Sequence, residues 1–455
     1  MRVVLEVAQK GGQRHLVPVP VGVLVSACRV PDPRNNHSNV AMMQSPDSVA
    51  IQYKVRPWSP EHFRLLDKSF KLLGELGNDV LYVPVIVSAD KGEKAGAIRW
   101  VKDGAGWRGE FGAFEKLLDV YVRHCGEPKA VALCVWSAAT ATSVARAYEG
   151  SQTPSAPGKA SRPLLVTLLE ESTGRMSDMP APRFGENGDE AFWRPMLEGV
   201  RQVVRKRGWS DRVIVLGEGG DVRPSRQTGE LLRRWAPYAR WDILSHFSGD
   251  PGSGFYKGPH KDDFQAGRMI ATGDLEVALK EYPGGGICRA DQLAARLRQR
   301  LDYLDLPNHR WQVVRDSPPV HFRTLLQGFE GLSRFGLDFW PVGARGRSLL
   351  SGWTGGSRVR APVDCVTAPG PDGAEPTVRF EMMREAIQDL DVRIAILRAV
   401  EGADQQRRKE CLELLDGLRA HVGPQYAAYA ARVYEMAARL AGASTGATWD
   451  NPPRP

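Results

Sequence analysis

The residues best suited to catalysis follow predicted strands. An apolar run at residues 213–216 leads into Glu218, which lies between Gly217 and Gly219, and Asp221 follows shortly after. A continuous apolar run is typical of a buried strand in a parallel sheet, and α/β enzymes place their chemistry at the carboxyl ends of such strands. Glu218 is therefore a candidate proton donor, with Asp221 as a second carboxylate. The alternative is a polar loop that merely follows a strand.

Other acidic and aromatic residues also stand near the ends of predicted strands. They are Trp136, Glu170, Glu171, His246, Asp316, Asp338, Phe339 and Trp340. Carboxylates beside flat aromatic rings suit a carbohydrate site, since two acids can serve glycosidic cleavage. We place Glu171 with the catalytic candidates and expect Glu170, Trp136, His246, Asp316, Phe339 and Trp340 to bind substrate. Core packing of the aromatic rings and a structural role for His246 are the competing interpretations.

The elements that would position these residues alternate between strand and helix. Strands are predicted at 48–55, 80–87, 130–136, 164–169, 213–216, 241–247, 311–314 and 335–341. Ser59 and Pro60 suit the N-cap and first position of a helix, and Gly77 and Gly208 suit helix ends. The pattern favours an α/β fold, a (β/α)₈ TIM-type barrel whose strand-end acids meet on one face. An open doubly wound sheet is the runner-up, but no GxGxxG follows an early strand.

Segments of different character flank the predicted barrel, which spans 49–345. Residues 1–48 alternate short apolar runs with Gly, Pro and Asn, and predict a small β layer. Residues 346–441 predict a β and helical appendage with helices at 377–398, 405–418 and 425–440. The first of these helices carries an apolar stripe that we expect to pack on the barrel. Residues 442–455 have the composition of a disordered tail.

Composition narrows the possible partners. The chain has 455 residues and a formal net charge of +8, but its basic residues are spread out, so no nucleic-acid partner is expected. Six scattered cysteines form no CxxC pair, and no metal-ligand spacing stands out, so neither metal nor cofactor is expected. No apolar stretch is long enough for a membrane span, and residues 1–5 show no signal-peptide pattern. The chain as given would be cytoplasmic unless trimmed, and its oligomeric state is left open.

Four stretches occur in an order and spacing similar to those of a known family. They read RPWSPEHF at 56–63, RKRGWSDR at 205–212, FGLDFW at 335–340 and PTVRFEMMREAIQD at 376–389. Together they resemble the catalytic region of glycoside hydrolase family 123 and uncharacterised domains related to it, over residues 49–398. The resemblance implies a barrel preceded by a β-sandwich, a carbohydrate substrate and β-N-acetylgalactosaminidase activity.

The family's mechanism is substrate-assisted, and the resemblance implies roles for an Asp-Glu pair. The Asp orients the 2-acetamido group that attacks the anomeric carbon, and the Glu protonates the leaving oxygen. Here Gly217-Glu218-Gly219 stands where the family has Asp-Glu-Pro, so the acid is kept and the orienting Asp is replaced by glycine. Asp221 and the Glu170-Glu171 pair are the candidate substitutes.

Three functions are therefore open at the level of sequence. The first is a glycoside hydrolase-like protein acting on N-acetylated amino sugars or related glycans, with Glu218 as general acid. The second is a catalytically degenerate barrel that serves as a carbohydrate-binding or scaffold protein. The third is a sugar-processing enzyme of another reaction type.

Overall fold

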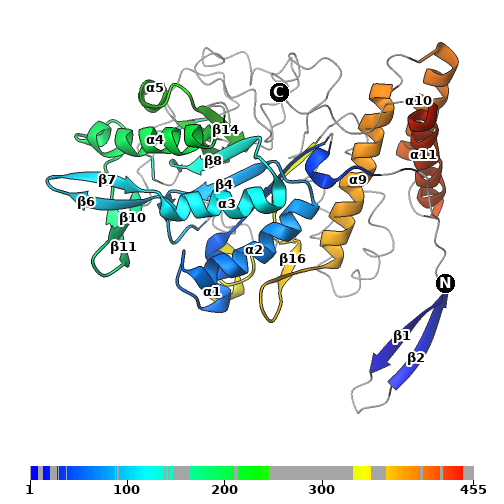
Figure 1. The fold of residues 1–455 in the computed structure, drawn as a ribbon, viewed down its shortest axis with the longest axis horizontal. Coiled ribbons are helices and arrows are strands. Elements are labelled where there is room, and N and C mark those ends of the chain that lie inside the picture. The colour runs from blue at the N-terminus through cyan, green and yellow to red at the C-terminus, as the bar shows by residue number, and fades with distance from the viewer. Residues whose placement is uncertain are drawn as a thin grey trace.

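A four-stranded parallel sheet forms the centre of the molecule (Figure 1). The computed structural model describes residues 2–8, 14–20, 28, 30–36, 38–87, 89, 92–137, 140–141, 144–146, 163–209, 214–220, 222–224, 226–244, 331–349, 365–399, 403–420 and 424–443. The sheet has the order β14-β12-β8-β4, with β4 at Val80–Pro84, β8 at Ala130–Cys134, β12 at Ile214–Gly220 and β14 at Arg240–Leu244. Leu133 of β8 is in register with Val83 on one side and Leu216 on the other, so the carboxyl ends share one edge.

Strand β3 (Asn39–Met43) lies beside β4 and pairs in parallel with β15 (Gly331–Gly336) in a separate two-stranded sheet. Three side chains join β3 to β4. Asp79 Oδ2 accepts from the Val40 N–H (2.9 Å), Asn78 Oδ1 from the Met42 N–H (2.7 Å), and Gln44 Oε1 from the Tyr82 N–H (2.9 Å). We call these three side chains the β3–β4 seam. The expected β layer at 1–48 thus contributes β3 to the central strands.

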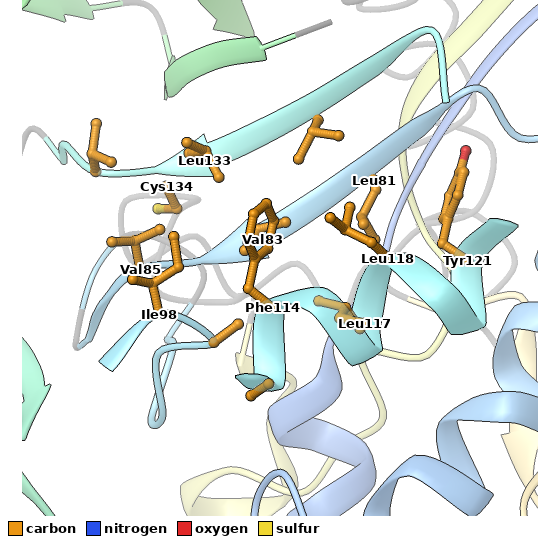
Figure 2. Close-up of a cluster of buried hydrophobic side chains, with 14 of the residues drawn as sticks. Leu81, Val83, Val85, Ile98, Phe114, Leu117, Leu118, Tyr121, Leu133 and Cys134 are labelled. Atoms are coloured by element: carbon orange, nitrogen blue, oxygen red, sulfur yellow. The ribbon is translucent and has the colours of Figure 1, made fainter. Parts of the chain in front are cut away.

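The central strands are buried on both faces, as parallel sheets usually are. The outer face packs against α3 (Gly112–Cys125), where Phe114, Leu117 and Leu118 lie over Leu81 and Val83 (Figure 2). The opposite face forms a separate cluster of Ala41, Met43, Val80, Tyr82, Ala130, Ala132 and Phe339. Alternate residues of each strand therefore face the helix layer and the inner cluster in turn.

A second sheet lies beside the central one and has the order β11-β10-β6-β7, with β5 paired to β10. Its strands are β5 (Ile86–Val87), β6 (Arg99–Asp103), β7 (Gly106–Glu110), β10 (Leu165–Glu170) and β11 (Arg175–Pro180). Trp100 stacks on Phe192 of α4 (Asp189–Lys206), with ring centroids 5.2 Å apart. The apolar face of this helix is buried, including Trp193 and Val200. The strand predicted at 164–169 exists as β10, but it belongs to this second sheet.

The helix signals near residue 60 are confirmed, whereas the strand predicted at 48–55 is wrong. Helix α2 (Pro60–Glu75) begins as expected, because the Ser59 side chain accepts from the His62 N–H, and Gly77 follows it with a φ of +68°. Residues Pro46–Tyr53 form helix α1 instead of a strand. The Ser45 side chain caps α1 and Pro46 occupies its first turn, a signal that outweighs the β-branched residues after it.

A helical unit follows the central strands (Figure 1). It comprises α9 (Val378–Ala399), α10 (Gln405–Ala420) and α11 (Pro424–Ala443), preceded by a hairpin of β16 (Thr367–Pro369) and β17 (Ala374–Pro376). Phe380 and Ile387 of α9 join the main core, while Val392 and Ile396 pack in the cluster shared with α10 and α11. Helix α9 is therefore buried on two sides, not on the single stripe that the sequence predicts.

Shorter elements complete the described chain. They are hairpin β1 (Arg2–Ala8) and β2 (Arg14–Pro20), strands β9 (Val144–Arg146) and β13 (Val222–Pro224), helix α5 (Arg226–Trp235), and 3₁₀ turns Pro33–Asn35 and Ala344–Gly346. No helix in the described ranges is both long and apolar enough to cross a bilayer.

The fold is mixed α/β, and its central strands are parallel. The described strands do not include a complete (β/α)₈ barrel. The predicted strand at 311–314 lies outside the described residues. Two of the predicted barrel strands take other places, because 48–55 is helical and 164–169 pairs in the second sheet.

Candidate functional site

A small pocket lies at the carboxyl ends of β3, β4 and β8. It has room for about one water molecule, and its lining combines polar and apolar groups. The lining residues are Gln44, Ser45, Pro46, Asp47, Tyr82, Val83, Pro84, Glu93, Cys134 and Phe339. This edge of a parallel sheet is where α/β enzymes hold their catalytic groups, so we take the pocket as the candidate site.

Two buried carboxylates, Asp47 and Glu93, dominate the pocket. Asp47 accepts from the backbone N–H groups of Lys94 (3.0 Å) and Ala95 (3.1 Å). Burial raises the pKa of Asp47 to about 7; the hydrogen bond from Lys94 opposes this rise, and the negative charge of Glu93 adds to it. A carboxyl group that titrates near neutrality can both give and take a proton, which is the property that acid–base catalysis requires.

Glu93 has a second neighbour in the thiol of Cys134, the last residue of β8. The thiol donates to Glu93 Oε1 over 3.2 Å, which ties the loop that carries Glu93 to the end of the strand. Because Asp47 holds the next two residues of the same loop, Glu93 is fixed from both sides. The loop therefore has a defined conformation at the mouth of the pocket.

Asp338 is a third buried carboxylate at this edge and follows β15. Its Oδ1 accepts from the N–H of Ser45, the residue that caps α1, over 2.7 Å. Burial raises the pKa of Asp338 to about 6, against the lowering effect of the Ser45 hydrogen bond. Asp338 thus holds the start of α1, and with it Asp47, in place.

His62 joins the loop before α2 to Pro46, a residue that lines the pocket. Its Nδ1 accepts from the N–H of Trp58 (2.9 Å), so the neutral ring carries its proton on Nε2, which lies 2.9 Å from the Pro46 carbonyl. Burial lowers the pKa of His62 to about 4. Trp58 has a left-handed φ of 60°, a strained value for a large side chain, and the histidine holds it there. The tryptophan of the 56–63 stretch is therefore a structural residue next to Pro46.

Glu218 lies in β12, at the same edge of the central sheet. Leu216 is in register with Leu133 of β8, and Glu218 comes two residues later, beyond the last residue of β12 that pairs with β8. It is in register with Asp242 of β14, after a shift between Leu216 and Glu218. The backbone of Glu218 thus occupies the carboxyl-end position that the sequence predicts. Asp221, His246 and Asp316 lie outside the described residues.

The Glu170-Glu171 pair lies in a different environment. Glu170 ends β10 and Glu171 begins the turn to β11, so both stand at the tip of a hairpin in the second sheet. Both are exposed; Glu171 pairs with Arg108 (2.5 Å) and Glu170 with Arg175 (3.5 Å). The structure does not bring these acids together with the central-strand carboxylates as one converging set.

The three aromatic candidates are all buried, in three different settings. Phe339 lines the pocket beside Glu93. Trp136 lines a separate small pocket with Arg183 and Thr228. Trp340 is fully buried, and its Nε1 donates to the Thr367 carbonyl over 3.2 Å, so it packs in the core.

Sequence reasoning missed Asp47, Glu93 and Cys134. The Ser45-Pro46-Asp47 sequence is a helix start in which an acidic residue follows proline, and this signal could have placed Asp47 at a strand end. Glu93 lies in a loop of Gly, Lys and Ala residues and carries no local signal. Only the folded chain brings it to Asp47.

Comparison with known proteins shows similarity to one family of glycoside hydrolases. Residues 43–246 match the family model described as glycoside hydrolase 123, catalytic domain. A solved family 123 glycoside hydrolase from Clostridium perfringens, studied for the details of glycolipid glycan hydrolysis, is similar in fold, with a TM-score of 0.55 and 11% sequence identity. The similarity covers 97% of this chain and 75% of that one. No curated protein matches the sequence. The matched region contains Asp47, Glu93, Cys134 and Glu218, and over residues 43–246 the chain resembles the catalytic domain of glycoside hydrolase family 123.

Proposed function

We propose that this protein is a glycoside hydrolase-like enzyme that acts on N-acetylated amino sugars or related glycans, with Glu218 as the general acid. The observation that carries the proposal is the position of Glu218 at the carboxyl end of a central parallel strand. That strand neighbours β8, whose last residue lines the pocket with the buried carboxylates. The match of residues 43–246 to the family's catalytic domain supports the same chemistry. The proposal includes closure of the central strands into a (β/α)₈ barrel.

Gly217 has no side chain that could perform the orienting role of the family's Asp. We propose that the Asp47–Glu93 pair supplies the missing negative charge at this edge. The pair lies at the carboxyl ends of β4 and β8, on the β8 side of β12, and both acids are buried. Its charge therefore acts through a medium of low dielectric constant. Asp221 and Glu171 remain the other candidates, and Asp221→Asn and Glu171→Gln test them in the same assay.

The test is hydrolysis of aryl β-glycosides of N-acetylgalactosamine and N-acetylglucosamine by the full chain. Glu218→Gln should lower kcat by about 10²–10⁴-fold, because a general acid contributes that much. Glu93→Gln should lower it by about 10–10²-fold through the lost charge. Glu171→Gln removes an exposed acid at the hairpin tip and should leave kcat unchanged if the Asp47–Glu93 pair supplies the charge. Equal rates for wild type and Glu218→Gln would exclude Glu218 as the acid.

The catalytically degenerate, carbohydrate-binding barrel is the second candidate, and Gly217 favours it. If wild type is inert on all these glycosides, Gly217→Asp restores the family's Asp-Glu pair. Activity that appears only in that variant, together with calorimetric binding of the sugars by wild type, would support the binding role for the natural chain.

A further inference from the structure

A second, wider hollow lies next to the candidate site and is open to solvent. Its volume is about 540 Å³, within the range of sites that hold small molecules. The lining residues are Arg56, Pro57, Lys94, Ala95, Thr167, Thr173, Arg175, Met176, Ser177 and Asp178. We call it the basic groove. It runs between the loop before α2, the Glu93 loop and the β10–β11 hairpin.

Cations outnumber carboxylates in the basic groove. Arg56, Lys94 and Arg175 face one acid, Asp178, and Arg175 also pairs with Glu170 outside the lining (3.5 Å). Within the part of the chain that the structure describes, Arg56 and Lys94 have no carboxylate within ion-pair distance, unlike many of the other exposed basic side chains. Two unpaired cations that line the same hollow attract an anion.

The chain segments that carry Lys94 and Arg56 place both side chains at the basic groove. Lys94 follows Glu93, and its N–H is fixed by Asp47, so consecutive residues of one loop line the pocket and the groove. Arg56 extends toward the turn of the β10–β11 hairpin, where a Cβ added to Gly174 would come within 3.3 Å of its Nη2. Gly174 has a φ of +65°, so the turn beside Arg56 favours glycine.

The remaining lining suits a sugar. Pro57, Ala95 and Met176 supply apolar surface for the C–H face of a ring, and Thr167, Thr173 and Ser177 supply hydroxyl groups. An inorganic anion alone would use only the cations. A charged saccharide would use the whole lining.

We propose that the basic groove binds the anionic substituent, a carboxylate or a sulfate, of an acidic saccharide. The inference rests on the proposed function, because the groove adjoins the pocket through the Glu93 loop and would hold one sugar of a glycan whose neighbour lies over the mouth of the pocket. It names the substrate class as acidic glycans. Arg56 contacts the anion through two parallel N–H groups, and Lys94 contacts it as a point charge.

The test is calorimetric binding to the full chain, without hydrolysis. The probes are two matched pairs, 3′-sialyllactose against lactose and N-acetylgalactosamine 6-sulfate against N-acetylgalactosamine, together with sodium sulfate alone. At least one acidic saccharide should bind about tenfold more tightly than its neutral partner, and its affinity should fall as NaCl rises from 50 to 300 mM, roughly as screening predicts. Sodium sulfate should bind more weakly than the saccharides.

Substitutions of the lining residues test whether the acidic saccharide binds in the basic groove. Arg56→Gln and Lys94→Gln should each weaken it by about 5–10-fold, and Asp178→Asn should strengthen it by about twofold, because that carboxylate opposes the ligand. Lys102→Gln removes an exposed lysine from β6 and should change nothing. Glu218→Gln should bind like wild type, which separates this test from the hydrolysis assay.

Three outcomes would overturn the proposal. The first is equal binding of the acidic and neutral partners in both pairs, or no binding of either acidic probe. The second is loss of binding in Lys102→Gln to the same extent as in Lys94→Gln. The third is binding of sodium sulfate as tight as that of the saccharides, which would leave a site for a free anion only.

Discussion

The acids at the edge of the central sheet and those of the β10–β11 hairpin differ in burial and in the partners of their carboxylates. Asp47, Glu93 and Asp338 are buried, and the two aspartates hold backbone N–H groups. Glu170 and Glu171 are exposed, and each pairs with an arginine side chain. Burial makes a carboxyl group costly to ionise, and solvent exposure makes an ion pair weak. A sequence that places acids after strands does not distinguish these two cases.

Asp47→Ala is the substitution that should separate the two regions most. It removes the acceptor of one buried and one part-buried N–H group, at about 1–2 kcal/mol each, so the free energy of unfolding should fall by about 2–4 kcal/mol. Urea denaturation of Asp47→Ala and Glu171→Ala in parallel measures the contrast. Equal losses in both variants would show that burial does not distinguish the two regions.

The pH dependence of stability should differ between the two regions as well. The unfolded chain loses the Asp47 proton near pH 3.8, while the folded chain keeps it to about 7, so this group stabilises the fold at low pH. That contribution is lost as pH rises from about 4 to 7, by about 2–4 kcal/mol at one pKa unit per 1.36 kcal/mol. Asp47→Asn should flatten this part of the stability curve. A slope as steep as that of wild type would contradict the assignment.

His62 should give a smaller effect with the opposite sign. Its folded pKa of about 4 lies below the ordinary 6.5, so the stability it contributes is present above pH 6.5 and is lost as pH falls toward 4. His62→Gln keeps a donor and an acceptor without titrating, and should cost about 1–2 kcal/mol at pH 7. Thermal unfolding between pH 4 and 7 compares the two. A wild-type loss below pH 6.5 that persists unchanged in the variant would assign it to another group.

Glu171→Gln should have the smallest effect. Its partner Arg108 is 43% exposed and Glu171 is 51% exposed, so solvent screens the pair and the loss of stability should stay under about 0.5 kcal/mol. The same variant tests the catalytic candidacy of Glu171 in the glycoside assay. A stability loss above about 1 kcal/mol would mean that the hairpin tip is not the exposed, weakly coupled region described above.

Sequence signals at helix ends correctly predicted where those helices begin and end. Ser59 and Pro60 placed α2 correctly, and Gly77 and Gly208 both adopt the left-handed conformation expected at helix ends. The apolar run before Glu218 predicted β12. These features depend on residues close in the chain, so a single sequence carries them.

Features that depend on distant residues were not predictable in this way. The hairpin of β6 and β7 has few apolar residues, and Trp100 is buried only because α4 covers it. Glu93 becomes part of the candidate site through Cys134 and the Asp47 loop contacts, which no local pattern encodes. The resemblance to a family located Glu218 but said nothing of the carboxylates around it.

The β3–β4 seam has a consequence for how the strands find their alignment. Strand β3 pairs with β15, and within the described part of the chain no backbone ladder joins β3 to β4. The amide of Gln44, the amide of Asn78 and the carboxylate of Asp79 each meet one particular N–H group instead. Successive N–H groups of a strand point to opposite edges, so a shift of one residue would take these donors away from the three side-chain oxygens, at about 1–3 kcal/mol for each. The side chains of the β3–β4 seam, and not a repeating backbone ladder, therefore fix the alignment of β3 beside β4.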